Sequence, residues 1–247
     1  MIIDFHTHLR NSIFGYGQTT KQLLNNMNKY GIDKAVVCPV KPFNYHFASE
    51  NNFIAKTSEK YSNKLIGFCR VDPRQKAKAV KEVQRCVEKL GLKGIFLHPW
   101  EETFQISDDI VVPVIEAAEH YKLPVMISGG HLRVSRAFQI SDIASRFPKV
   151  KFIITSGGQI NISGSALFEA ETMIKENPNI TIETSGIYRE DFIEEIVEKY
   201  GKERVVFGSN SPEYHIGFEL KRAQWAHLSS EKIEALSWTN AAKLLQL

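Results

Sequence analysis

Two histidines near the start of the chain, His6 and His8, have the side chains best suited to binding a metal ion. They stand at the end of a short apolar run, residues 2–6, that we expect to be a strand. Side chains two residues apart in a strand point to the same side, so both imidazoles can reach one ion. Neutral imidazole is a common metal ligand. The spacing therefore predicts a metal-binding pair, and the other interpretation is two surface histidines without a shared ligand.

Three further polar residues stand near the ends of apolar runs. His98 precedes Pro99, which ends its run, so it is either a site residue or a turn histidine. Arg70 is expected to pair with a substrate carboxylate or, equally, to form a salt bridge with Asp72 or its neighbours. Glu183 is open to three roles, which are metal ligand, base and buried structural acid.

Eight apolar, β-rich runs alternate with segments of helical periodicity and would position these residues. The runs are mostly apolar rather than alternating, which indicates parallel strands buried on both faces. Eight such units predict an α/β protein with a single domain, residues 1–247, folded as a (β/α)8 TIM barrel whose active site lies at the carboxyl ends of the strands. An open doubly wound sheet is the alternative, although no G-x-G-x-x-G motif follows the first run. The predicted strands are residues 2–6, 34–38, 65–71, 92–97, 125–128, 150–156, 180–184 and 205–208.

The composition limits the classes of partner. Basic residues number 31 and acidic residues 28, which leaves a formal net charge of +3. The basic residues form no dense run, so we expect neither a nucleic-acid site nor a polybasic lipid site. The chain has no apolar stretch of membrane-spanning length and no leader-like start, and its three scattered cysteines indicate no disulfide framework. We therefore expect a cytoplasmic protein with a small-molecule substrate.

An aromatic segment follows the second predicted strand. It contains Phe43, Tyr45, His46 and Phe47. Such a cluster has two interpretations, a lid over a substrate or a contact between the subunits of a homodimer.

Six segments in chain order resemble motifs of the amidohydrolase-related family, in the branch that includes aminocarboxymuconate-semialdehyde decarboxylase-like enzymes. The first segment, residues 3–8, reads I-D-F-H-T-H, and residues 93–99 are similar to the family pattern K-G-I-K-L-H-P. Each segment alone is a weak signal, but together they cover nearly the whole chain. The other four are residues 123–130, 146–158, 206–212 and 239–245.

The resemblance implies a metal centre that this chain keeps only in part. The family binds its ion with the H-x-H pair, a histidine after strand five and an aspartate after strand eight, and a histidine after strand six lies beside the metal or ligates it. Ser128, Ser156 and Asn210 stand at the strand-five, strand-six and strand-eight positions. A serine hydroxyl is a poor zinc ligand, and an amide cannot act as a base at neutral pH. We therefore expect zinc or another divalent metal to be weakly bound or absent.

The resemblance also implies the reaction, which is metal-dependent hydrolysis or non-oxidative decarboxylation of a small organic substrate, with a carboxylate as the expected class. His6 and His8 are then the metal ligands, and His98 and Asn210 belong to the catalytic centre. The residues assigned to substrate binding are Arg70, Ser128, His131, Ser156 and Glu183.

Two alternatives remain open at this point. His131 lies three residues beyond Ser128, where it is either a replacement ligand or a plain loop residue. The alternative function is a metal-independent enzyme or a small-molecule binding protein on the same scaffold, because a fold does not determine a function.

Overall fold

Parallel strands form the centre of the molecule in the computed structural model, which describes residues 1–159 and 164–247. Strand β1 (Ile3–Asn11) pairs with β3 (Lys34–Pro39), and β3 pairs with β4 (Leu65–Gly67). Strand β5 (Cys69–Arg70) continues the path of β4 after one residue. The remaining parallel strands are β6 (Ile95–Leu97), β7 (Val125–Ile127), β8 (Phe152–Ile154), β9 (Ile180–Glu183) and β10 (Val205–Val206).

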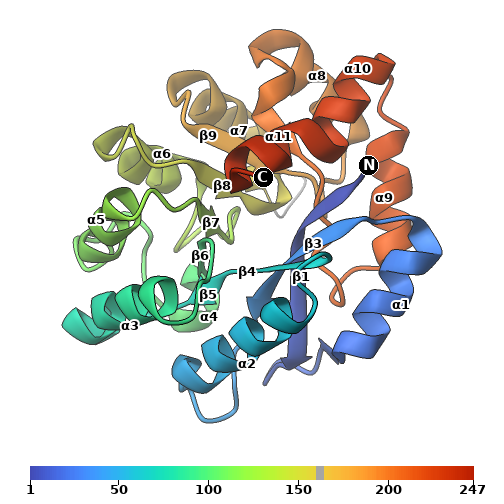
Figure 1. Cartoon of the computed structure of the whole chain (residues 1–247). Coiled ribbons are helices and arrows are strands. Elements are labelled where there is room, and N and C mark those ends of the chain that lie inside the picture. Colours follow the sequence, from blue (N-terminus) through green and yellow to red (C-terminus); the bar gives the residue numbers. More distant parts are fainter. Residues whose placement is uncertain (160–163) are drawn as a thin grey trace.

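Backbone hydrogen bonds join the first strand to the segment that follows the last one. The Phe5 N–H donates to Phe207 O over 2.9 Å, and the His8 N–H donates to Ser211 O over 2.7 Å. A parallel bridge between Thr7 and Ser211 lies beside them. The strands thus close into a ring surrounded by helices (Figure 1), and the expected (β/α)8 barrel is confirmed.

Helices cover the outside of the ring. The first, α1 (Thr20–Tyr30), begins with a capping box in which the Thr19 hydroxyl accepts from the Gln22 N–H. It ends at Gly31, whose φ of 68° lies in the left-handed region that favours glycine. The other helices between strands are α2 (Phe47–Lys60), α3 (Ala77–Glu88), α4 (Pro99–Glu102), α5 (Val112–His120), α6 (Ala137–Arg146), α7 (Gly164–Glu176) and α8 (Glu190–Tyr200). After β10 come α9 (Ile216–Gln224), α10 (Ser230–Glu234) and α11 (Asn240–Leu245).

Two apolar cores pack on the two sides of the ring. Leu97 and Ile127 belong to the outer core, between strands and helices. Phe96 and Met126, which are their neighbours in the same strands, belong to the inner core that fills the barrel. This alternation is the period of two that an extended backbone imposes. Leu245 of α11 also belongs to the inner core, so this helix closes the amino end of the barrel.

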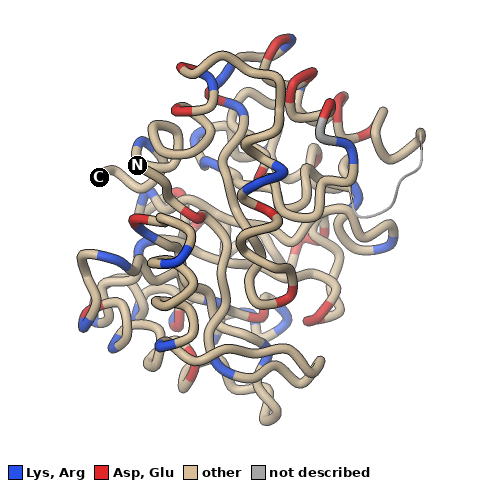
Figure 2. Tube along the Cα trace, turned by 90° about the vertical axis from the view of Figure 1, so that its right-hand side faces the viewer, with Lys and Arg blue, Asp and Glu red and all other residues tan. Residues whose placement is uncertain are grey.

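The two chain ends lie close together at the amino end of the barrel (Figure 2). Acidic and basic positions are interspersed over the side of the molecule that this view shows. Among the described residues, no helix is both long enough and apolar enough to cross a bilayer.

Candidate functional site

A cavity of about 500 Å³ opens at the carboxyl ends of the strands, and we call it the mouth cavity. Parallel strands of a barrel bring these ends to one face, so residues far apart in the sequence share its lining. The lining includes side chains from β1 and from the segments after β6, β7, β8 and β10. The predicted site residues that line it are His6, His8, His98, Ser128, His131, Ser156 and Asn210.

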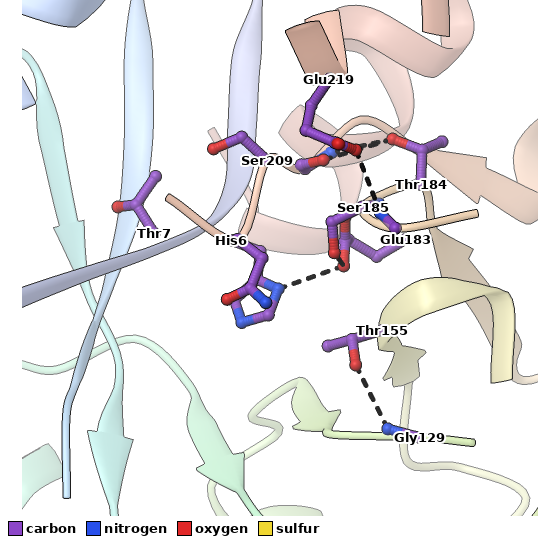
Figure 3. Close-up of polar contacts among 12 residues, drawn as sticks. His6, Thr7, Gly129, Thr155, Glu183, Thr184, Ser185, Ser209 and Glu219 are labelled. Atoms are coloured by element: carbon purple, nitrogen blue, oxygen red, sulfur yellow. Dashed lines mark hydrogen bonds and ion pairs between the residues drawn. The ribbon is translucent and has the colours of Figure 1, made fainter. Parts of the chain in front are cut away.

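His6 and His8 face one another in the mouth cavity. Their Nε2 atoms lie 3.1 Å apart. His6 Nδ1 lies 3.1 Å from Glu183 Oε2, and the Ser185 hydroxyl donates to the same oxygen over 2.8 Å (Figure 3). The Ser185 N–H donates to the other carboxylate oxygen. Glu183 therefore accepts the proton on His6 Nδ1 and leaves Nε2 directed at His8, as an outer carboxylate does for a metal-binding histidine.

His8 has no comparable outer partner. Its Nδ1 is buried without a hydrogen bond to any described residue. Burial lowers the pKa of His6 to about 3 and lowers the pKa of His8 well below its ordinary value, so both imidazoles are neutral at pH 7. In this neutral pair, the His8 Nε2–H donates to the Nε2 lone pair of His6. Directing both lone pairs at an ion would move the His8 proton to Nδ1, where the backbone carbonyl of Pro39 is the available acceptor.

The histidine pair fits two positions around a metal ion. Two nitrogens bound to one tetrahedral zinc ion at about 2.0–2.1 Å lie roughly 3.4 Å apart. The observed separation of the two Nε2 atoms, 3.1 Å, is close to this value. Within residues 1–159 and 164–247, no group of three or more His, Cys, Asp or Glu side chains is arranged to hold a metal ion. The described residues thus supply two ligands at this place.

Ser128, Ser156 and Asn210 line the mouth cavity at the ends of three strands. Ser156 and Asn210 have φ values of 54° and 50°, in the left-handed region that few non-glycine residues adopt. Asn210 Nδ2 donates to Glu213 Oε2 over 3.1 Å, and Glu213 also lines the cavity. Burial raises the pKa of Glu213. An amide therefore occupies the position after β10, but a carboxyl group three residues further on reaches the same cavity.

Glu101 is a buried cavity residue that the sequence did not single out. Burial opposes its ionisation, but the Arg70 guanidinium beside it outweighs this effect and holds the pKa of Glu101 at about 2. Tyr16 OH donates to Glu101 Oε1 over 3.1 Å, and His98 Nε2 lies 3.8 Å from the same oxygen. Burial lowers the pKa of His98 well below its usual value. The site thus contains a neutral imidazole beside an ionised carboxylate. The sequence feature that could have indicated Glu101 is the acidic pair Glu101–Glu102 just after the end of a predicted strand.

Arg70 lies behind the mouth cavity and not in its described lining. Its side chain is fully buried and pairs with Glu101 and with Glu102, whose Oε1 is 2.7 Å from Nη2. Asp72 forms its ion pair with Arg74 instead, at 2.9 Å. The guanidinium therefore holds Glu101 in place, and Asp72 is not its partner.

Glu183 likewise lies outside the described lining, directly behind His6. It is fully buried, and burial raises its pKa to about 7 against the opposing effect of the Ser185 hydrogen bonds. Of the three roles that the sequence left open, the geometry matches a buried acid that orients a histidine.

The mouth cavity has an aromatic rim. Trp100 stacks on His131 with ring centroids 5.6 Å apart, and Phe14 lies 5.3 Å from Trp100. Burial lowers the pKa of His131. Neither lysine nor arginine is among the described residues that line the cavity. A planar apolar group fits this rim, whereas a negatively charged group meets no lysine or arginine side chain among the described lining residues.

Comparison with known proteins identifies the family. A family model described as amidohydrolase matches residues 3–247, and the chain belongs to this family. Its structure is similar to that of 5-carboxyvanillate decarboxylase from Sphingomonas paucimobilis, with a TM-score of 0.80 and 15% identity over 100% of this chain and 99% of that one.

Two further solved structures show the same fold. One is 4-oxalomesaconate hydratase from Rhodopseudomonas palustris, with a TM-score of 0.75 and 19% identity over 100% of this chain and 96% of that one. The other is 5-carboxyvanillate decarboxylase from Novosphingobium aromaticivorans in complex with manganese and a nitrobenzoic acid, with a TM-score of 0.80 and 14% identity over 100% and 96% of the two chains. At such low sequence identities, the structural similarity establishes the fold alone.

Proposed function

We propose that this chain is an enzyme that decarboxylates or hydrolyses a small organic carboxylate in the mouth cavity, with a divalent metal ion at His6 and His8. The observation that carries the proposal is the facing pair of Nε2 atoms, 3.1 Å apart, with Glu183 behind His6. The structural similarity to decarboxylases, one of them in complex with manganese, supports the same class of reaction.

The lining suggests a division of roles among its residues. His6 and His8 would hold the ion, which when bound would polarise a substrate oxygen and supply the positive charge that the lining lacks. His98, which is neutral and close to the ionised Glu101, is placed to exchange a proton with the substrate. The aromatic rim of Trp100 and Phe14 would hold the flat part of the substrate.

The test is turnover of a panel of small carboxylates by the chain supplied with manganese or zinc. We expect product with metal, and its loss in the double variant His6→Ala/His8→Ala. The control, His120→Ala/His227→Ala, removes two imidazoles outside the described lining of the mouth cavity and should keep the activity. Turnover that persists without His6 and His8, or without any metal, would contradict the proposed metal role.

A second candidate function is a metal-free enzyme or small-molecule binding protein. Ser128, Ser156 and Asn210 favour it, because they line the cavity where the family resemblance implies two histidines and an aspartate. The combined variant Ser128→His/Ser156→His/Asn210→Asp should bind zinc more tightly than the parent and show a larger zinc-dependent rise in Tm. Single replacements should do little, because the ligands of one ion act together. An equal zinc response in the parent and the folded triple variant would show that these positions do not converge on one ion.

A further inference from the structure

A second cavity, of about 840 Å³, opens at the opposite end of the barrel, and we call it the basal cavity. Its lining comes from the segments that precede β7, β8, β9 and β10, together with α11. These are the amino ends of the strands, so the barrel core and α11 separate this cavity from the mouth cavity. Neither the family match nor the proposed function assigns it a role.

Arg204 is the buried charge of the basal cavity, and its side chain is 8% exposed. Its Nε donates to Ile180 O over 2.8 Å, and its Nη2 donates to Ile174 O and Asn177 O over 2.7 and 2.8 Å. In the described part of the chain, no carboxylate forms an ion pair with this guanidinium. The hydrogen bonds to described residues use Nε and Nη2, which leaves Nη1 without a partner among the described residues.

A buried arginine without a carboxylate partner is unusual, because removing a charge from water is costly unless an opposite charge compensates it. The three carbonyl oxygens hold the guanidinium in one orientation but carry only partial charge. Burial accordingly lowers the pKa of Arg204. An anion in the basal cavity would compensate this charge and would find Nη1 free to donate.

Four lysines in the same lining add positive charge around Arg204. Lys149 and Lys151 lie just before β8, Lys122 lies in the turn before β7, and Lys243 belongs to α11. None of the four takes part in an ion pair within residues 1–159 and 164–247. Lys122 has a φ of 54°, which is an uncommon conformation for a residue with a side chain. These lysines come from three separate segments of the chain and meet around one cavity.

The lining also contains acidic residues, which limit its net charge. Glu116 and Glu119 come from α5, and Glu203 precedes Arg204. The five basic residues still outnumber the three acidic ones. The mouth cavity has the opposite balance, since Glu101 and Glu213 face it without a lysine or arginine in the described lining.

We propose that the basal cavity binds a small anion with two or more negative charges, held by Arg204 and the four lysines. Multivalent anions suit this arrangement because several cations from different segments can contact separate oxygens of one ligand. The ligand chemistry is that of a diphosphate or of a tricarboxylate. This proposal does not depend on the proposed function of the mouth cavity.

The test is calorimetric titration of the metal-free full chain with inorganic diphosphate and, separately, with citrate at low ionic strength. We expect one equivalent of at least one anion to bind, with an affinity that falls as salt is added. The variant Lys149→Ala/Lys151→Ala/Lys243→Ala should weaken binding at least about tenfold. Binding of diphosphate alone would assign the site to phosphate chemistry, and binding of citrate alone would assign it to carboxylates.

The matched control is Lys78→Ala/Lys81→Ala/Lys89→Ala, which removes the same charge from exposed positions in and just after α3. It should change the affinity by no more than about twofold, because distant surface charges are screened. Arg204→Lys keeps the charge but loses the fork of donors, and it should also weaken binding if it folds. The proposal is overturned if neither anion binds the parent, if the control variant loses as much affinity as the basal one, or if His6→Ala/His8→Ala abolishes the binding.

Discussion

Two arginines buried at opposite ends of the barrel carry their charge in different ways. Arg70, behind the mouth cavity, pairs with Glu101 and Glu102. Arg204, in the basal cavity, donates to backbone carbonyls and has no carboxylate partner among the described residues. The protein pairs the first charge with two carboxylates, whereas the second is held by backbone carbonyls and has Glu203 as a nearby acid that forms no ion pair with it among the described contacts. The groups that contact a buried arginine therefore indicate, better than its degree of burial, whether the arginine is structural or available to bind a ligand.

Replacing each arginine by methionine should expose this difference most strongly. Arg70→Met removes the guanidinium from the buried Glu101 and Glu102 and leaves Lys41, 3.7 Å from Glu102 Oε1, as their remaining lysine or arginine partner, so it should lower the free energy of unfolding by about 3–5 kcal/mol at pH 8. Burial already raises the pKa of Glu102 in the parent, and the loss of Arg70 would raise it further and would also raise the pKa of Glu101, so the variant would lose stability as pH rises and its defect would be smaller at pH 5. Arg204→Met removes hydrogen bonds but leaves no carboxylate unpaired, so its cost, about 1–3 kcal/mol, should be similar at both pH values.

Urea unfolding of both variants at pH 5 and pH 8 measures these quantities. Arg74→Met is the control, because the Arg74 side chain is 45% exposed in its ion pair with Asp72 and should matter by less than about 1 kcal/mol. The comparison would fail if the two buried variants showed the same change with pH.

The mouth end should also make the parent protein sensitive to pH through Glu219 of α9. This buried carboxyl group accepts the Gly186 N–H over 3.0 Å, and burial raises its pKa to about 7 despite the opposing charge of Arg222. An unfolded glutamate titrates near about 4.3, so between roughly pH 4 and 7 the folded state binds more protons. Stability contributed by this group is therefore lost as pH rises through that window.

Glu219→Gln should reduce the loss of stability between pH 5 and pH 8 by about 1–3 kcal/mol, because an amide does not ionise. Thermal or urea unfolding across this range measures the slope. Glu116→Gln removes an exposed carboxylate from the basal lining and should retain the slope of the parent. An unchanged slope in Glu219→Gln would show that this group does not titrate in the window.

The smallest expected effects come from the two ends of α1, which lie toward the two ends of the barrel. Thr19→Ala removes the hydroxyl that accepts the Gln22 N–H and should cost about 1 kcal/mol. Gly31→Ala places a side chain at a φ of 68°, with open space around it, and should cost about 1–2 kcal/mol through backbone strain alone. Thr19→Ser keeps the cap and serves as control in urea unfolding. Neither variant should alter zinc or diphosphate binding. Altered binding of either ligand would show that the ends of α1 influence the cavities.

The barrel could be predicted from the sequence because each strand is a compact apolar run between helical segments. The exact ends of the strands were harder to predict. The first strand was predicted at residues 2–6 but extends over Ile3–Asn11, because Arg10 and Asn11 pair with the two-residue strand β2 (Gly17–Gln18). The sixth run, residues 150–156, ends earlier as β8 because a 3-10 turn begins at Thr155. Such turns depend on tertiary contacts that no local pattern encodes.

Local spacing predicts the histidine pair of the site and the family resemblance predicts other lining residues, but neither predicts the contacts between distant segments. His6 and His8 emerge from a spacing of two, whereas the contact between His6 and Glu183 joins residues from β1 and β9. The partner of Arg70 was not predicted, because it depends on α4 folding back across the end of β5. The roles of Asn210 and Ser128 stay predictions.

The position of α11 has a practical consequence for handling the protein. Because Leu245 packs into the inner core and β1 starts at the same end, both chain ends emerge on the basal side (Figure 2). A peptide tag at either end would sit near the basal cavity, where its charges would compete with an anion. A sensor surface that captures the chain through such a tag would leave the mouth cavity facing the solution. Titrations of the two cavities therefore call for different attachment chemistry, with tag-free protein for the basal one.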